Sequence, residues 1–298
     1  MTLQEIEAFV AVAETGSVTR AALRLNLTQP AATRRIQNFE AAFGDGLFNR
    51  AVKPAVLTSL GTHVLEHCRR VLKAVAELEA CASNEADPSG SLNAGVAHGL
   101  GEMVLTTPLD VLRRKFPRIA LKVSSNWTTQ LIENVRSGEI DCAVGLMTDA
   151  HTVPAPLARV PLGPEQVIIV AASRTRARRN GKPWRLRELA DGGWFLNPPG
   201  CGCRAALVRA FEQMQLPIRI AAEIFGEDLQ LSLLARSGGL GLVPQRQFEH
   251  SPHRHELQIL DVLDFSLPAT VTLIRNAAPG RFDRVIELLV RELRAKLA

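Results

Sequence analysis

Amide, hydroxyl and guanidinium groups recur at helical spacing in the stretch TQPAATRRIQNFE, residues 28–40. Gln29, Thr33 and Gln37 lie four residues apart, and Arg34 follows directly after Thr33. In a DNA major groove, glutamine pairs with adenine and arginine with guanine, while other arginines hold phosphates. These residue types at this spacing predict hydrogen bonds from one helix face to a nucleic acid.

Three helical segments are needed to position that face. Apolar residues recur at helical spacing from Leu3 until Gly16 stops them, and Ser17 is a good cap for a second helix through Leu25. Thr28 caps the third helix. The apolar stripe expected to pack the third helix on the first two consists of Ala32, Ile36, Phe39 and Phe43. An ordinary surface face of a small helical domain remains an alternative interpretation.

After the third helix, DGLFNRAVKPAVLT predicts a turn and two short strands. Arg50 and Lys53 lie in this stretch, where they would contact the DNA backbone as a wing. The basic side chains of this region therefore belong to a patterned structural unit.

A long set of residues in this region matches one family pattern: Phe9, Gly16-Ser17, Ala21-Ala22, Leu25, Thr28-Gln29-Pro30-Ala31, Ile36, Phe39-Glu40, Gly44, Leu47-Phe48, Arg50 and Leu57-Thr58-x-x-Gly61. In these residues the chain resembles the N-terminal domain of LysR-type transcriptional regulators. Thr28 and Thr33 stand where the family often has serine, and Phe39 where it usually has leucine. The resemblance implies a winged helix-turn-helix over residues 1–61 that binds double-stranded DNA. The candidate DNA-binding residues are Gln29, Pro30, Ala31, Thr33, Arg34, Arg35, Gln37, Arg50 and Lys53.

A long helical pattern follows, with Thr58 as its expected cap. Its apolar residues alternate spacings of four and three, which is typical of a coiled-coil seam: Val64, Cys68, Val71, Val75, Leu78 and Ala82. We expect residues 58–89 to hold a dimerisation helix and a hinge, the hinge falling in the polar stretch 83–91. The family resemblance implies a homodimer, usually assembled into a homotetramer, that reads an inverted-repeat promoter site. RNA polymerase is a further candidate partner.

The same helix contains a metal-like motif. His63, Glu66 and His67 match the H-x-x-E-H pattern of inverted metallopeptidases, and two histidines at this spacing can share one metal ion. Val64 lies in the expected seam, however, and no third ligand is evident nearby. We expect two partly exposed helix histidines and no metal.

From residue 90 onward, strand and helix patterns alternate, which predicts βαβαβ units and a parallel sheet. The predicted strands are 92–97, 120–125, 140–146, 167–172, 193–196, 218–225, 240–243 and 270–275, and the predicted helices are 103–116, 128–137, 204–215, 228–236 and 282–297. Two such units indicate an α/β fold of two lobes, with lobe 1 at about 90–162 and 269–298 and lobe 2 at about 163–268. The motifs GEIDCAVGL and GGLGLVP resemble the LysR effector-binding domain over residues 90–298, related in fold to periplasmic solute-binding proteins.

That resemblance implies a small-molecule effector in a cleft between the lobes. Strand ends and helix starts nominate residues 97–99, 126–129, 146 and 147 in lobe 1, and 197–201 and 225–227 in lobe 2. The candidate effector-binding residues among them are Ala97, His98, Gly99, Trp127, Thr128, Thr129, Met147, Asn197, Pro198 and Phe225. Thr128 is the leading candidate, because its hydroxyl would face a carboxylate and so favours an organic acid. Trp127 either stacks on the effector or packs in the core.

Composition limits the remaining function classes. The chain has 298 residues with 46% hydrophobic residues and a net charge of +5, which permits a polyanionic partner. Acids at Glu5, Glu7 and Glu14 argue against a signal peptide or a membrane span at the start, so we expect a cytoplasmic protein. The basic run at 174–187 is either a solvated loop or a phosphate-binding segment.

No nucleophile, base and orienting acid stand at a recognisable motif spacing, so we predict no catalytic residues, no enzyme activity and no cofactor. Cys201 and Cys203 are either reduced thiols at a helix start or a redox switch. Two alternatives from other classes stay open: a small-molecule-binding transport protein and, more distantly, a metallopeptidase.

Overall fold

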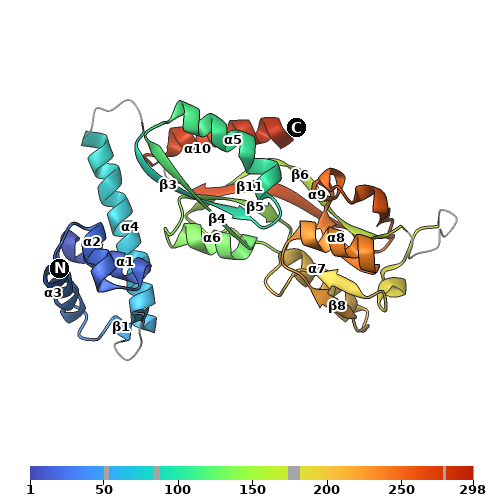
Figure 1. Ribbon diagram of the computed structural model, residues 1–298, viewed down its shortest axis with the longest axis horizontal. Coiled ribbons are helices and arrows are strands. Elements are labelled where there is room, and N and C mark those ends of the chain that lie inside the picture. The colour runs from blue at the N-terminus through green and yellow to red at the C-terminus, as the bar shows by residue number, and fades with distance from the viewer. Residues whose placement is uncertain (50–53, 83–87, 174–181, 278–279, 298) are drawn as a thin grey trace. The chain divides into compact units, whose positions relative to one another are not determined.

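The computed structural model describes residues 1–49, 54–82, 88–173, 182–277 and 280–297, with only the backbone described at 77, 80–82, 102–106 and 227 (Figure 1). The described chain forms two compact units, Met1–Ala86 with Ser137–Glu139, and Asp87–Arg136 with Ile140–Ala298. None of the described helices has the combination of length and apolarity needed to cross a bilayer.

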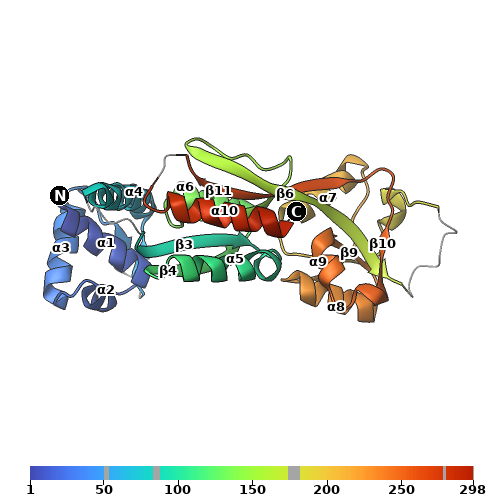
Figure 2. The same ribbon diagram turned by 90° about the horizontal axis from the view of Figure 1, so that it is seen from above.

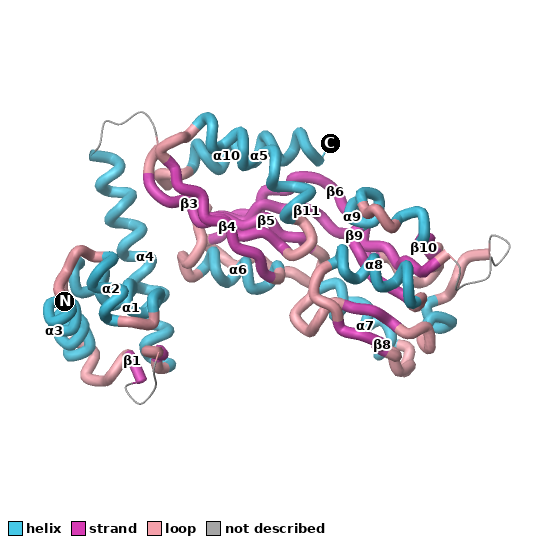
Figure 3. Tube along the Cα trace, in the orientation of Figure 1, coloured by secondary structure: helices cyan, strands magenta, loops and turns pink. Residues whose placement is uncertain are grey.

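The first unit is helical apart from a two-stranded ribbon (Figure 3). Its elements are α1 (Leu3–Thr15), α2 (Val18–Arg24), α3 (Gln29–Ala41), β1 (Phe48–Asn49), β2 (Val56–Leu57) and α4 (Ser59–Ala82). The caps expected at Ser17 and Thr28 are confirmed, since both side chains accept a backbone N–H of the first helical turn, those of Arg20 and Ala31. The ribbon is the predicted pair of short strands. Arg50 and Lys53 lie outside the described residues.

Aromatic packing fixes α3 against α1 and the ribbon. The Phe9 ring centroid lies 5.0 Å from that of Phe39 and 5.3 Å from that of Phe48. Glu40 is buried beside this cluster, and its Oε1 accepts the N–H groups of Leu47 at 2.8 Å and Phe48 at 3.1 Å. A buried carboxylate therefore ties the C-terminal part of α3 to the first ribbon strand, a role that the sequence pattern did not reveal.

The dimerisation residues expected on α4 fall into two groups. Val64 and Cys68 are buried in the unit's own core with Phe9 and Phe39, so their assignment to an intermolecular seam is wrong. At these two residues the heptad spacing reflects packing within one chain. Further along the helix, Val71 is 43% exposed and Leu78 is 72% exposed. The accessible part of the predicted seam therefore begins at Val71.

The second unit consists of one mixed sheet with helices on both faces. Its strands are β3 (Gly90–Ala97), β4 (Ile119–Asn126), β5 (Cys142–Met147), β6 (Leu157–Ala172), β7 (Trp194–Leu196), β8 (Ile220–Glu223), β9 (Leu240–Pro244), β10 (Leu257–Leu260) and β11 (Leu267–Asn276). Its helices are α5 (Gly101–Lys115), α6 (Thr128–Arg136), α7 (Gly202–Gln213), α8 (Glu227–Ser237), α9 (Gln245–His250) and α10 (Asp283–Leu297), with short 3₁₀ turns η1 (Leu186–Leu189) and η2 (Arg254–Glu256). The strand order is β4-β3-β5-β11-β6-β9-β7-β8, and β10 pairs with β6.

The prediction of a parallel sheet is only partly correct. β3 pairs in parallel with β4 and β5, and β7 with β8 and β9. In contrast, β6, β10 and β11 pair antiparallel with their neighbours. Parallel neighbours need a crossover segment, whereas β11 returns from the far lobe directly alongside β6. Residues 90 and 91, placed in the expected hinge, belong to β3.

The two longest strands connect the two lobes, and Figure 2 shows β6 and β11 side by side. β6 begins at Leu157, ten residues earlier than the predicted 167, because Pro161 and Pro164 obscure its pattern. Proline cannot donate to a strand ladder and is tolerated at irregularities. The register of β6 against β11 shifts opposite Val271 and Thr272, which places the irregularity at this proline-containing segment.

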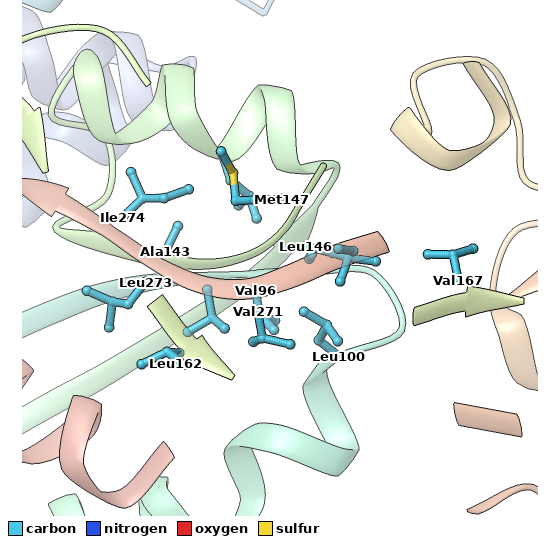
Figure 4. Packing of buried hydrophobic residues seen from close by; sticks show 14 of the residues in the cluster. Val96, Leu100, Ala143, Leu146, Met147, Leu162, Val167, Val271, Leu273 and Ile274 are labelled. Atoms are coloured by element: carbon cyan, nitrogen blue, oxygen red, sulfur yellow. The ribbon is translucent and has the colours of Figure 1, made fainter. Parts of the chain in front are cut away.

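Lobe 1 buries apolar side chains on both faces of its strands. α5 and α10 cover one face and α6 the other (Figure 1). Figure 4 shows Val96, Leu146, Leu162 and Val271 from four different strands within one cluster. All six residues of β5 are buried, as expected for a strand covered on both faces.

In lobe 2, successive side chains of β6 pack into two helical layers on opposite faces of the sheet. Ile169 and Ala171 belong to the cluster that contains Trp194, whereas Val170 and Ala172 pack with residues of α8 and α9. Successive strand residues point to opposite faces, so β6 divides its side chains between the two layers. This short segment therefore fixes helices on both sides of lobe 2.

A buried ion pair lies where β6 passes between the lobes. The Glu165 side chain is 1% exposed, and the Arg246 Nε lies 3.5 Å from its Oε2. Glu165 Oε1 accepts the N–H of Gln166 at 2.9 Å, and Arg246 Nη2 donates to the Leu297 carbonyl at 2.8 Å. Burial raises the pKa of Glu165. The pair therefore connects β6, α9 and α10 at a cost in desolvation.

Glu165→Gln is expected to change the pH dependence of stability in a defined direction. The folded pKa lies above the unfolded value of about 4.3. Relative to the variant, the parent therefore loses stability as pH rises from below about 4.3 through the folded pKa. Urea unfolding of the full chain between about pH 3 and 8, followed by tryptophan fluorescence, measures this difference and covers the range below the unfolded pKa.

Glu133→Gln is the control with opposite sign. A side-chain hydrogen bond from Arg136 lowers the pKa of Glu133, so the parent should gain stability over this variant as pH rises through that lowered pKa towards the unfolded value. The gain is expected to be small because the side chain is 45% exposed. A Glu165→Gln difference that does not vary with pH would contradict the interpretation.

Candidate functional site

One face of α3 presents the polar groups expected from the sequence. Gln29, Pro30, Arg34 and Gln37 are exposed, whereas Ala32, Ile36 and Phe39 on the apolar stripe are buried. The residues that line one open groove along this face are Gln29, Pro30, Thr33, Arg34, Gln37 and Asn38. Ala31 is half-buried at the start of the helix and does not line that groove.

A second groove joins this face to α2 and the ribbon. Its volume is about 730 Å³, and Gln29, Thr33 and Gln37 contribute to it from α3. Thr19 and Asn49 also line it, although no pattern in the sequence selected them. Their polarity beside a predicted wing is the only signal that would have indicated them.

Internal hydrogen bonds divide the polar residues of α3 into those already engaged and those available. Thr33 Oγ1 donates to the Gln29 carbonyl at 2.9 Å, so its proton is used within the helix. Arg35 Nη2 donates to Gln4 Oε1 at 3.0 Å, which directs this guanidinium towards α1. Among the residues that the structure describes, none forms a hydrogen bond or ion pair with Arg34. Arg34 is therefore the arginine of this helix best placed to bind another molecule.

The second candidate site lies at the carboxyl ends of strands in the second unit. A cavity of about 40 Å³ is lined by residues from both lobes: Ala97, His98, Trp127, Thr128, Leu146, His151, Asn197, Cys201, Gly202, Cys203, Leu242 and Pro244. His151, Leu242 and Pro244 were not selected from the sequence. His151 follows β5, and Leu242 and Pro244 lie in β9. Only the order of strands in the sheet brings these segments close to β3 and α7.

Several nominated residues do not line this cavity. Met147 is part of the apolar core (Figure 4). Successive residues of β5 point to opposite faces, and Leu146 is the one that lines the cavity. Gly99, Thr129 and Pro198 are likewise not among its described lining residues. Phe225 contacts the ring cluster of the site, with its centroid 4.4 Å from that of His98.

The hydroxyl of Thr128 has a structural role that the sequence did not indicate. It donates to the Leu146 carbonyl at 3.2 Å and accepts the Leu146 N–H at 3.1 Å, and the residue is buried. Because a hydroxyl has one proton, this side chain cannot also donate to an effector carboxylate without breaking the bond to β5. The expectation that Thr128 faces a carboxylate as a donor is therefore wrong for this conformation.

Two uncharged histidines line the cavity. His151 Nδ1 accepts the Thr148 N–H at 3.1 Å, which places the ring proton of the neutral form on Nε2. Burial lowers the pKa of His151, and Arg209 lowers it further. Burial also lowers the pKa of His98, whose Nδ1 lies 2.9 Å from Ser125 Oγ. No Lys, Arg, Asp or Glu is among the described lining residues, so the cavity has polar groups but no net charge at neutral pH.

The other candidate motifs give no site of their own. Arg70 Nη2 lies 3.2 Å from His67 Nδ1, where an arginine can only donate. Over the described part of the chain, no three His, Cys, Asp or Glu side chains gather as metal ligands do. Cys201 and Cys203 lie at the start of α7 and form no disulfide with any described cysteine. The basic run is largely outside the described residues.

Comparison with known proteins covers both units. Residues 3–62 match the family model described as the bacterial regulatory helix-turn-helix protein of the lysR family, and residues 85–298 match the LysR substrate binding domain. The chain is 27% identical over 294 residues to the HTH-type transcriptional regulator BbuR of Bordetella bronchiseptica, covering 97% of this chain and 89% of the relative. It is also 27% identical over 251 residues to CzcR of Bacillus subtilis, covering 84% and 82%.

Solved structures share the fold at lower identity. A full-length OxyR variant from Pseudomonas aeruginosa has a TM-score of 0.77 and 21% identity, with 99% of this chain and 98% of that chain covered. Full-length CbnR complexed with its target DNA has a TM-score of 0.61 and 20% identity, with 99% and 100% covered. These similarities confirm an N-terminal helix-turn-helix followed by a two-lobed α/β domain.

Arg34→Ala is expected to weaken specific DNA binding. If Arg34 contacts a base, the binding free energy should fall by about 1–3 kcal/mol. If it holds a phosphate, the slope of log affinity against log salt concentration should fall by about one. Anisotropy titrations with duplex DNA at several salt concentrations distinguish the two results. Arg35→Ala removes the same charge from the same helix and should have the smaller effect, because that guanidinium is bound to Gln4. Parental affinity and slope in Arg34→Ala would contradict this assignment.

Proposed function

Because this chain belongs to the LysR family of bacterial transcriptional regulators, we propose that it recognises promoter DNA through α3 and couples this binding to a small molecule held between its two lobes. It is a DNA-binding transcriptional regulator with an effector-binding domain. The observation that carries the DNA-binding assignment is the capped, core-anchored α3, whose exposed face presents Gln29, Arg34 and Gln37 along one groove.

The chemistry of that face supports recognition of base edges. A glutamine amide can pair with the major-groove edge of adenine, and an unengaged arginine with guanine. Arg50 and Lys53 remain the proposed phosphate contacts of the wing. The other proposed DNA contacts of α3 are Pro30, Ala31, Thr33 and Arg35.

The effector is proposed to be a small organic acid. The cavity lies where the starts of α6 and α7 approach the ends of β3 and β5, and free amides at helix starts favour an anionic group. Ala97, His98, Trp127 and Asn197 line this cavity and remain candidate contacts. Without Thr128 as a donor, backbone amides are the groups proposed to meet the acid.

Self-association is proposed through the outer part of α4. Val71, Val75 and Leu78 follow the seam spacing beyond the residues that the unit's own core has taken. Pairing two copies would give two winged domains, which suits an inverted repeat. A homodimer, and a homotetramer built from it, is therefore our proposal for the assembly. We also propose a cytoplasmic location and no enzymatic activity, consistent with relatives that are transcriptional regulators.

Val71→Glu should weaken dimers, because it would place an unpaired carboxylate in the proposed seam, where desolvation is costly. Sedimentation equilibrium should show a larger fraction of monomer. Leu23→Glu, a similar change at an exposed apolar residue of α2, should leave the association unchanged. Parental association of Val71→Glu would exclude this part of α4 from the interface.

The coupling of the two functions is tested on the full chain. Retention on promoter DNA should weaken steeply with salt, because lysine and arginine contacts release counterions. Adding organic acids from a thermal-shift screen should change the DNA affinity, since a ligand shifts a two-state protein only through its differential affinity for the two states. Salt-insensitive DNA binding would contradict the first proposal, and ligands that bind without altering DNA affinity would contradict the coupling.

A further inference from the structure

Three aromatic rings meet at the cleft between the lobes. The His98 ring centroid lies 4.6 Å from that of Trp127 and 4.4 Å from that of Phe225, both with edge-to-face geometry. Trp127 and Phe225 lie 5.5 Å apart. His98 and Trp127 follow β3 and β4 of lobe 1, whereas Phe225 follows β8 of lobe 2. One ring from lobe 2 is thus seated against two rings of lobe 1.

The cavity beside these rings is too small for a metabolite as it stands. Its volume of about 40 Å³ holds at most a few water molecules, while small-molecule sites measure about 300–1,000 Å³. A ligand that binds in this cleft therefore has to displace part of its wall. Phe225 is not among the described lining residues, but its ring packs on two that are, His98 and Trp127, so these three rings are the groups to compare.

Two of the three rings are held in place. Trp127 packs on Gly200, where an added Cβ would lie 3.0 Å from its Cδ1. His98 Nδ1 lies 2.9 Å from Ser125 Oγ, within hydrogen-bonding distance. The first contact seats Trp127 against the segment that precedes α7 in lobe 2, and the second ties the His98 ring to β4.

Phe225 is held less firmly. The residue is 57% exposed, so most of its surface already faces solvent. The next residue is Gly226, with φ at +103° and no atom within 4 Å of an added Cβ. A glycine in this region of backbone space adjoining open space can reorient the preceding residue without a steric barrier from a side chain. Phe225 is therefore the movable ring of the cluster.

We propose that His98 and Trp127 form a ring-binding subsite, that Phe225 fills it when no effector is bound, and that the effector carries a flat unsaturated ring that replaces Phe225. This proposal rests on the function proposed for the cleft and adds the chemical class of the ligand. Edge-to-face contacts depend on the charge distribution of an aromatic ring, which a saturated ring of similar size lacks. Phe225 is thus a specificity-determining residue and a built-in competitor.

The test uses phenylacetate as the probe and cyclohexylacetate as the saturated control with the same acid group. Removing the competitor in Phe225→Ala should raise the affinity for phenylacetate by roughly tenfold, the value of about two aromatic contacts. Cyclohexylacetate should gain much less. Calorimetric titration of the full chain measures both ligands.

Matched variants isolate the ring effect. Leu229→Ala, which removes an apolar side chain at a position of α8 that is 55% exposed, should leave both affinities unchanged. Phe225→Leu keeps an apolar side chain without a ring. This variant should still bind phenylacetate more tightly than the parent does. Adding His98→Leu to Phe225→Ala should remove most of the preference for the aromatic probe.

Each outcome decides the proposal. No phenylacetate binding in Phe225→Ala, or equal gains for both probes, would overturn it. A metabolite that alters DNA affinity while showing no ring preference would also overturn it and leave the proposed function intact. Ring-dependent binding that leaves DNA affinity unchanged would support the subsite and contradict only the proposed coupling.

Discussion

The antiparallel pairing of β6 with β11 is the constraint on which the second unit depends. Both strands run from one lobe into the other, so each of them contributes residues to the sheet of both lobes. The register shift near Pro161 and Pro164 and the buried Glu165–Arg246 pair lie on this connection. Because the strands of both lobes are aligned on this ladder, the ends of β3 and β5 and the start of α7 meet around one cavity.

The binding surfaces of this chain depend on which polar side chains are not already hydrogen-bonded within the fold. Thr128 uses its hydroxyl to hold α6 to β5, and Thr33 bonds to its own helix. Arg35 is bound to α1, whereas no described residue engages Arg34. A buried polar group without a partner costs free energy, so most such groups are consumed internally. The groups still available therefore mark the binding surfaces better than polarity does.

The two sites differ in their electrostatics in a way that suits their partners. The α3 face presents a free guanidinium beside neutral amides, which matches a duplex with charged phosphates and patterned base edges. The cleft has no charged lining side chain among its described residues, and its histidines are held neutral by burial. Under the ring-binding proposal, selectivity there comes from ring contacts and backbone amides, which discriminate by shape and charge distribution.

The sequence determined the helix-turn-helix, its caps and the strand–helix alternation of the second unit, because these follow from local periodicity and turn chemistry. It also nominated His98, Trp127 and Phe225 as candidate effector contacts, since strand ends and helix starts are local features. Only the tertiary structure decided what those residues contact: Val64 and Cys68 became core, and Met147 faced away from the cavity. The antiparallel course of β6 and the approach of His151 were likewise undetermined, since pairing direction and contacts between distant segments depend on residues far apart in the chain.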